Sequence, residues 1–185
     1  MTSAGCDAAG YELLIVDEDG RQLPKGEAGE IILRGAGLMR KYWGLPEKTA
    51  ESLVDGWFHT GDLGYRDDRN FLHVIDRRND MIISGGENVY PREVEAALAE
   101  HPAMPDAAVI GLPDPKWGEV VSCVLRDDAP ADEELEAWLR DRIAGYKIPR
   151  RWYRLPELPR NATGKVLKVQ LREQFGKSQW TSGDN

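Results

Sequence analysis

Cysteine, long apolar runs and excess basic charge are all scarce in this 185-residue sequence. Its two cysteines, Cys6 and Cys123, cannot form a disulfide framework, and with three scattered histidines they make no zinc pattern. This cysteine usage favours a reducing, cytoplasmic setting. No apolar stretch approaches the ~20 residues that a membrane-spanning helix needs. The first six residues lack the basic start and apolar core of a signal peptide.

The charge balance excludes one broad class of partner. A formal net charge of −8 argues against non-specific binding to nucleic acid or acidic membranes. The charge is uneven, however, because basic residues dominate between Arg140 and Arg172: Arg142, Lys147, Arg150, Arg151, Arg154, Arg160, Lys165 and Lys168. This stretch is either a solvated basic face or a surface that meets phosphates.

The first part of the chain is typical of β-structure without a self-sufficient core. Its apolar runs and turn residues predict strands at 11–16, 30–33, 57–59, 63–65 and 71–75. Pro46 suits the first turn of a short helix over 46–53.

Beyond the charged, turn-prone segment Asp76–Asp80, strand and helix patterns alternate. Strands are predicted at 81–84, 107–110, 120–125 and 152–155, and helices from Pro91, around 135–143 and over 166–175. The expected fold is therefore α+β: a β-rich, incomplete piece over 1–76, then a compact domain over 77–185 with a small sheet covered by helices.

Two glycine-containing segments have both a structural and a functional interpretation. The Thr-Gly-Asp of His59–Leu63 is usually just a turn between strands, but a carboxylate such as Asp62 can accept both hydroxyls of a ribose. Gly85 and Gly86 fit an ordinary hairpin turn, yet backbone without side chains also lets a narrow ligand pass closely.

Two further segments are equally open when taken alone. The proline-rich stretch 111–119 is predicted to be a loop, and its Trp117 is either a partly buried anchor or a ring that stacks on an adenine. The segment Leu158–Val166 superficially suggests a P-loop, but the leading glycine is absent and Val166 occupies the Ser/Thr position. Lys165 is then an exposed loop lysine or a point charge delivered to a polyphosphate.

In this order and spacing, the four segments resemble the later core motifs of the adenylate-forming superfamily. That superfamily comprises acyl-CoA synthetases, carrier-protein-loading adenylation domains and beetle luciferases, and the resemblance runs from about Tyr11 to Phe175. The segment Ser-Gly-Gly-Glu-Asn-Val-Tyr-Pro looks most like medium-chain, long-chain and aromatic acyl-CoA synthetases. Carrier-loading enzymes tend to have an arginine-bearing loop there.

The resemblance implies a two-step ligase that uses a carboxylic acid, ATP and CoA. The acid and ATP form an acyl-adenylate and pyrophosphate, and the acyl group then passes to the CoA thiol. Asp62 and Arg77 match residues that contact the ribose. Lys165 matches the catalytic lysine that bridges the carboxylate and the nucleotide during adenylation. Such a cation offsets the repulsion between two anions, an effect worth roughly 3–4 kcal/mol for one preorganised group.

The resemblance assigns a second set of residues to thioester formation, after a rotation of the C-terminal domain. Ser84, Gly85 and Gly86 match the loop that lines the pantetheine tunnel. Trp117 matches a position that stacks on the CoA adenine, and Arg150 lies where basic residues meet the CoA phosphates.

The sequence departs from the family at the hinge and upstream of it. Asn79 stands where members usually have Asp or Lys; because Asn tolerates turn conformations, we expect the rotation to survive. The phosphate loop and the aromatic-Gly-x-Thr-Glu segment, which in the family hold the phosphates, Mg²⁺ and the acyl pocket, do not occur here. The chain alone is therefore expected to be catalytically incomplete, with its Mg²⁺ ligands upstream and no metal ligand of its own.

The resemblance leaves one structural consequence and two alternative functions. Unpaired strand edges in residues 1–76 predict self-association through that half. The alternatives are a non-enzymatic module that binds CoA or a nucleotide, and an acyl-AMP ligase that loads a carrier protein.

Overall fold

The computed structural model describes residues 3–176 and confirms the α+β class. The chain divides into two compact units, Met1–Asn79 and Asp80–Asn185, and the division falls inside the charged segment 76–80. No helix of the described residues has the length and apolarity to cross a membrane.

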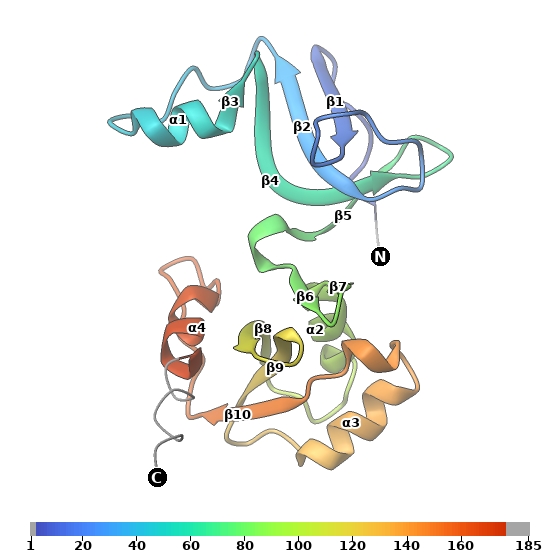
Figure 1. Ribbon diagram of the computed structural model, residues 1–185, viewed down its shortest axis with the longest axis vertical. Helices are drawn as coiled ribbons and strands as arrows, with labels where there is room; N and C mark the ends of the chain where they lie inside the picture. Colours follow the sequence, from blue (N-terminus) through green and yellow to red (C-terminus); the bar gives the residue numbers. More distant parts are fainter. Residues whose placement is uncertain (1–2, 177–185) are drawn as a thin grey trace. The chain divides into compact units, whose positions relative to one another are not determined.

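The first unit is built on one antiparallel sheet (Figure 1). Strands β1 (Tyr11–Val16), β2 (Gly29–Gly35), β4 (Trp57–Arg66) and β3 (Leu53–Val54) follow one another, and β5 (Leu72–Arg77) also pairs with β4. A short helix α1 (Pro46–Ser52) precedes β3 and buries none of its side chains. The core is small and aliphatic: Ile15, Val16, Ile31, Ile32, Leu63 and Ile75. β1 has the bounds predicted from its apolar run.

The prediction of two short strands separated by a Thr-Gly-Asp turn was wrong. Residues 57–66 form one continuous strand, β4, which bends beside β2 in Figure 1. The pairing with β2 is irregular, since Glu30 pairs with Leu63 but Ile32 pairs with His59. Between these two pairs β4 has three residues, 60–62, where β2 has only Ile31, so β4 forms a bulge. Gly61 lies in this bulge with φ +70°. Bulges bend a strand and re-aim its side chains, and this one lies immediately before Asp62.

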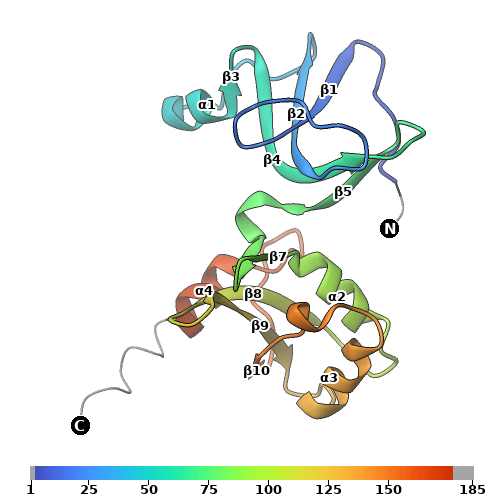
Figure 2. The ribbon, with the colours of Figure 1, turned by 45° about the vertical axis from the view of Figure 1, so that its right-hand side comes forward.

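The second unit contains a five-stranded sheet centred on β9 (Figure 2). The order is β10 (Arg151–Leu155), β9 (Gly118–Arg126), β6 (Ile82–Ser84) and β7 (Glu87–Val89), with β8 (Ala107–Asp114) also paired to β9. β9 and β10 are parallel, and the other pairs are antiparallel.

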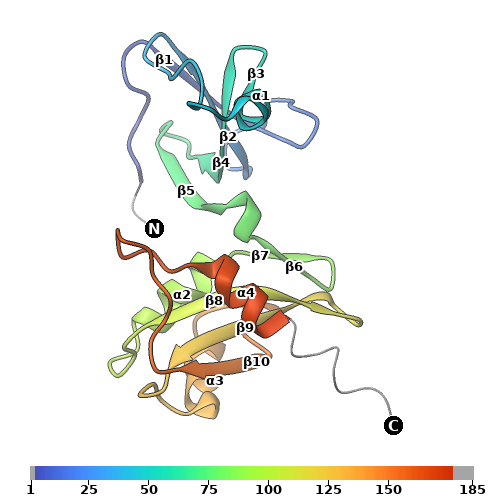
Figure 3. The same ribbon diagram turned by 90° about the vertical axis from the view of Figure 1, so that its left-hand side faces the viewer.

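Both faces of this sheet are covered, which explains the near-continuous apolar runs of β8 and β9. Val109 and Cys123 lie in one cluster with residues of α2 (Pro91–Ala99) and α3 (Asp132–Arg140). Ile110 and Val124 point to the opposite face, where Leu171 of α4 (Lys168–Gly176) packs (Figure 3). Two 3₁₀ turns, η1 (Arg78–Asp80) and η2 (Gly145–Lys147), complete the described elements.

The proline-rich stretch 111–119 was predicted as a loop and is mostly a hairpin. β8 continues to Asp114 and β9 begins at Gly118, so that only residues 115–117 lie between the strands. Pro113 is accommodated because it lies near the strand end, opposite Glu119. Trp117 is the last residue of this turn and is partly buried.

Candidate functional site

The structure brings Asp62 and Arg77 together across neighbouring strands. The two residues are register partners in β4 and β5, and Arg77 Nε lies 2.9 Å from Asp62 Oδ1. The pair is open to solvent, with side-chain exposures of 57% for Arg77 and 33% for Asp62. The carboxylate and the guanidinium therefore present polar groups to a ligand at the surface of the first unit.

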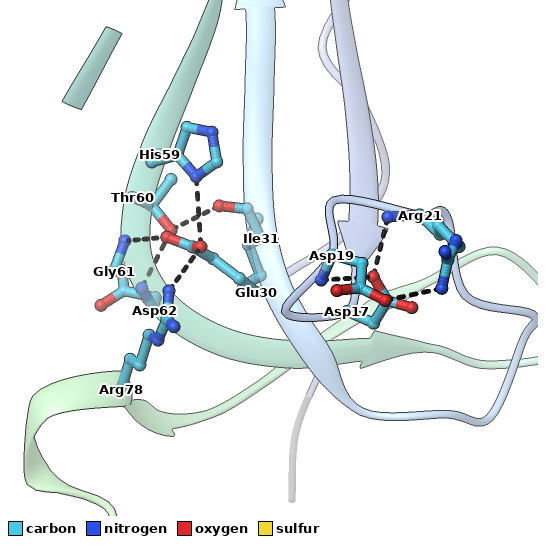
Figure 4. Close-up of polar contacts among 10 residues, drawn as sticks. All are labelled: Asp17, Asp19, Arg21, Glu30, Ile31, His59, Thr60, Gly61, Asp62 and Arg78. Atoms are coloured by element: carbon cyan, nitrogen blue, oxygen red, sulfur yellow. Dashed lines mark hydrogen bonds and ion pairs between the residues drawn. The ribbon is translucent and has the colours of Figure 1, made fainter. Parts of the chain in front are cut away.

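A buried carboxylate that the sequence did not reveal lies beside this pair (Figure 4). The amide of Gly61 donates to Oε1 of Glu30 at 3.2 Å. The other oxygen, Oε2, accepts from Nη1 of Arg78 at 3.2 Å and lies 3.1 Å from Nδ1 of His59. The Glu30 side chain is only 10% exposed. Its one sequence signal is a charged residue at the start of an otherwise apolar strand.

The proposed hinge residue Asn79 lies between two anchored neighbours. On its N-terminal side, Arg78 donates to Glu30 within the first unit. On its C-terminal side, Asp80 Oδ1 accepts from Nη2 of Arg172 at 2.7 Å within the second unit. Asn79 itself is exposed, at the last position of the first unit. This arrangement suits a short segment that absorbs backbone rotation while its flanks stay fixed.

In the second unit, the Gly85-Gly86 turn lies against Trp117. The Gly85 amide donates to the Trp117 carbonyl at 2.9 Å, and the buried Ser84 pairs with Gly118. Gly85 has φ +62°, and a Cβ added to it would lie 2.8 Å from Cε3 of the Trp117 ring. Only glycine fits there, because both the backbone conformation and the space exclude a side chain.

The Trp117 indole is also the centre of a small basic surface. The guanidinium carbon of Arg150 lies 4.3 Å from the ring centroid, and the Lys116 ammonium lies 4.9 Å from it. Of the predicted residues, Gly85, Trp117 and Arg150 therefore lie in direct contact, Gly86 follows Gly85 in the turn, and Ser84 is buried directly before it. A cleft of about 550 Å³ adjoins this basic surface, lined by Glu136, Arg140, Gly145, Ile148, Pro149 and Arg150.

Asp114 holds the turn that carries Trp117. Its Oδ1 accepts from the amides of Lys116 at 2.9 Å and Trp117 at 3.1 Å, and Arg151 pairs with its other oxygen. The Lys116 amide, and then the Trp117 amide and the Arg151 charge, hold the pKa of Asp114 below its ordinary value despite some desolvation. An aspartate that accepts from the backbone amide two residues later, as Asp114 does from Lys116, is a recognisable turn signal.

Lys165 extends from a loop that is itself well ordered by hydrogen bonds. Oδ1 of Asn161 accepts from the amides of Thr163 at 3.0 Å and Lys165 at 2.9 Å, and Gly164 has φ +83°. Arg160 donates to the Gly164 carbonyl and forms an ion pair with Asp106. Within residues 3–176 the Lys165 ammonium has no partner, and the residue is exposed. A fixed backbone and an uncommitted cation suit the binding of an anionic ligand.

The described residues 3–176 include no group of three or more His, Cys, Asp or Glu that could hold a metal ion.

Comparison with known proteins agrees with this arrangement. The family described as AMP-binding enzyme matches residues 1–43, and the AMP-binding enzyme C-terminal domain matches residues 93–165. The chain belongs to the AMP-binding, adenylate-forming enzyme family. This confirms the membership expected from the four motifs, and the two matches occur in the order that the C-terminal portion of such an enzyme requires.

Relatives in this family are acyl-CoA and acyl-carrier ligases. Feruloyl-CoA synthase of an Amycolatopsis species is 47% identical, over 94% of this chain and 36% of its own length. The fatty acid–[acyl-carrier-protein] ligase ScoC of Streptomyces coeruleorubidus is 42% identical, over 95% and 34%. The o-succinylbenzoate CoA synthetase of Bacillus subtilis, solved with ATP and magnesium, has a TM-score of 0.84 at 43% identity, over 91% and 35%. The chain spans about a third of the length of these relatives.

Proposed function

We propose that this chain is the C-terminal portion of an ATP-dependent acid:CoA ligase, and that alone it does not complete the reaction. The observation that carries the proposal is the Asp62–Arg77 pair, 2.9 Å apart at the surface of a chain of this family. Residues 1–76 then belong to the end of the large adenylation domain, and residues 77–185 form the mobile C-terminal domain that turns about Asn79. A cytoplasmic setting accords with the cysteine usage.

In the adenylation step, Asp62 accepts the ribose hydroxyls and Arg77 donates to the same sugar. Lys165 brings a positive charge to the point where the acid carboxylate and the α-phosphate meet. Its ammonium has no partner within residues 3–176, so no ion pair there has to break before it binds an anion. The loop backbone, fixed by Asn161, limits the reorganisation during the reaction. Mg²⁺ bound in the complete enzyme would neutralise further charge on the phosphates.

In the thioester step, Ser84, Gly85 and Gly86 line the passage for the pantetheine arm of CoA. Gly86 has no atom within 4 Å of the Cβ position, so its backbone is open on that side. Trp117 offers a ring to the adenine, while Arg150 and Lys116 at its surface meet the phosphates. Because Arg150 already covers the indole at 4.3 Å, stacking requires either the other ring face or a shift of Arg150.

A second candidate function is transfer of the acyl group to a carrier protein. It is favoured by one relative, ScoC, which is named as a fatty acid–[acyl-carrier-protein] ligase. Both reactions end on a phosphopantetheine thiol, so the glycine turn serves either acceptor. Transfer from a supplied acyl-adenylate to free CoA, compared with a holo carrier protein, separates the two.

Hydroxylamine trapping of the acyl-adenylate tests the main proposal. The assay uses ATP, Mg²⁺ and a panel of fatty and aromatic acids. Aromatic acids are tested first because feruloyl-CoA synthase is a relative. We expect no hydroxamate from the chain alone, and hydroxamate from a chimera in which it replaces the matching region of that relative. Turnover by the chain alone contradicts its incompleteness. A folded chimera that binds CoA but never adenylates favours a non-enzymatic binding module.

A further inference from the structure

Glu30 contacts the residues on either side of the Asp62–Arg77 pair. Gly61, which donates its amide to Oε1, immediately precedes Asp62. Arg78, which donates to Oε2, immediately follows Arg77. Both bonds lie within the first unit, and Figure 4 draws them as dashed lines from Glu30 to Gly61 and to Arg78. One carboxylate thus bonds to the residue before Asp62 in β4 and to the residue after Arg77, at the start of η1.

The exposed pair needs such support to keep its geometry. With side-chain exposures of 57% and 33%, Arg77 and Asp62 attract each other only weakly through solvent. The β4 backbone before Asp62 is also irregular, with the bulge and Gly61 at φ +70°. The order of the pair must therefore come from the backbone that carries it, and the Gly61–Glu30 bond fixes that backbone.

A glutamate is unusual at a buried strand position such as residue 30 of β2 if its role is only structural. Desolvating a carboxylate is costly unless hydrogen bonds replace the lost water, whereas an aliphatic side chain would continue the core of β2 without this cost. Both Glu30 oxygens are engaged, and all the groups that face them come from His59, Gly61 and Arg78. Every contact therefore falls on the segments that carry Asp62 and Arg77.

We propose that Glu30 is a positioning residue for nucleotide binding, which holds Asp62 and Arg77 in the geometry that receives a ribose. The proposal rests on the proposed function of that pair. Glu30 touches neither substrate nor reacting atoms. It acts through Gly61 in β4 and through Arg78, the first residue of η1, which directly follows β5.

Glu30→Gln is the most direct variant, because glutamine has the same shape but only one acceptor at its end. Whichever way the amide is turned, either Gly61 or Arg78 loses its acceptor. The matched control is Glu12→Gln, which changes the same group in the exposed Glu12–Arg34 pair of the same unit.

The experiment uses the full ¹⁵N-labelled chain and AMP as the probe. Hydrogen exchange of Arg77 Nε–H reports on its bond to Asp62, and an AMP titration reports on binding. We expect Glu30→Gln to accelerate that exchange and to weaken AMP binding, each by about tenfold, as the loss of one charge-assisted hydrogen bond predicts. Glu12→Gln should change neither. A folded Glu30→Gln chain with unchanged Arg77 exchange overturns the proposal.

A second variant decides the case if Glu30→Gln does not fold. Arg78 is 51% exposed, so Arg78→Gln should leave the fold intact while removing only the bond on the Arg77 side. We expect faster Arg77 exchange with an unchanged Gly61 amide, and unaltered Arg77 exchange contradicts the role of Glu30. If AMP shifts the NMR signals of neither Asp62 nor Arg77 in the unmodified chain, the proposed function of the pair fails. The exchange data still test whether Glu30 positions the pair.

Discussion

Gly85 lies so close to Trp117 that a single added methyl group would lie 2.8 Å from Cε3 of the indole. The neighbouring Gly86 shares the left-handed backbone, with φ +87°, but has no atom within 4 Å of its Cβ position. The two adjacent glycines therefore share the left-handed backbone but differ in the space at the Cβ position, which only in Gly85 is occupied by the indole. This makes them a matched pair for testing the proposed CoA site.

Gly85→Ala should displace the Trp117 ring, whereas Gly86→Ala should not. Both substitutions place alanine at positive φ, which costs roughly 1–2 kcal/mol of stability. Overpacking against the ring adds roughly 1–3 kcal/mol for Gly85→Ala alone. Urea unfolding and the NMR shift of the Trp117 indole N–H measure the two effects. Equal losses and equal indole shifts in both variants would show that the close contact has no consequence.

The Asp106–Arg160 ion pair should matter for adenylation although neither residue is assigned to the chemistry. Arg160 donates to the carbonyl of Gly164, one residue before Lys165, and forms an ion pair with Asp106, which directly precedes β8. Asp106→Asn should loosen the loop and lower the adenylation rate of the chimera by about tenfold, less than removal of Lys165 itself. Exchange of the Lys165 amide checks the cause. A slower reaction with unchanged amide exchange would contradict this explanation.

Asp114 should make the second unit sensitive to acid. The amides of Lys116 and Trp117 keep its folded-state pKa below the ordinary value. A lowered folded-state pKa means that the carboxylate contributes stability above its unfolded pKa of about 3.9. That contribution is lost as the pH falls through the lower, folded-state pKa. Urea unfolding at about pH 5 and about pH 2 should therefore differ less in Asp114→Asn than in the unmodified chain. An equal pH dependence in both would be inconsistent with this role.

Self-association through the first unit stays a prediction, and the structure indicates where to look for it. The outer edge of β1 is partly occupied, because the Leu13 carbonyl accepts from Arg66 and the Ile15 carbonyl from the Leu23 amide. Trp43, in contrast, is 90% exposed, with Leu45 and Val54 also exposed. We expect concentration-dependent dimers in sedimentation equilibrium, weakened by Trp43→Gln. A strict monomer with an ordered first unit would rule this out.

The sequence predicts elements whose signals are local. The apolar run 11–16 ends at an Asp-Gly turn, and the structure has β1 with those bounds. Pro91 correctly marks the start of α2. The bulge in β4 could not be predicted, because it depends on how β2 pairs with β4 rather than on the Thr-Gly-Asp residues themselves. The Glu30 contacts depend on the same long-range pairing.

The candidate site likewise contains residues that the sequence predicts and residues that only the structure reveals. Asp62, Arg77, Gly85, Trp117 and Lys165 follow from motif order, since each is weak alone and the series is specific. The structure adds what supports them: the cap by Asp114, the Arg160–Asp106 pair and the carboxylate of Glu30. The Arg160–Asp106 and Glu30–Arg78 contacts join residues distant in sequence, which local patterns do not report, whereas the Asp114 cap is local and has an ordinary turn signal.

The most direct test of the account is the effect of Lys165→Ala on the two half-reactions, measured separately in the chimera. Adenylation is followed by hydroxylamine trapping, and thioester formation by CoA consumption from supplied acyl-adenylate. We predict that Lys165→Ala lowers adenylation by about 100- to 1,000-fold and leaves thioester formation nearly unchanged. Lys48→Ala, which removes an exposed lysine of the first unit, should affect neither step. Equal losses in both half-reactions would contradict the division of roles between Lys165 and the Gly85-Gly86 turn.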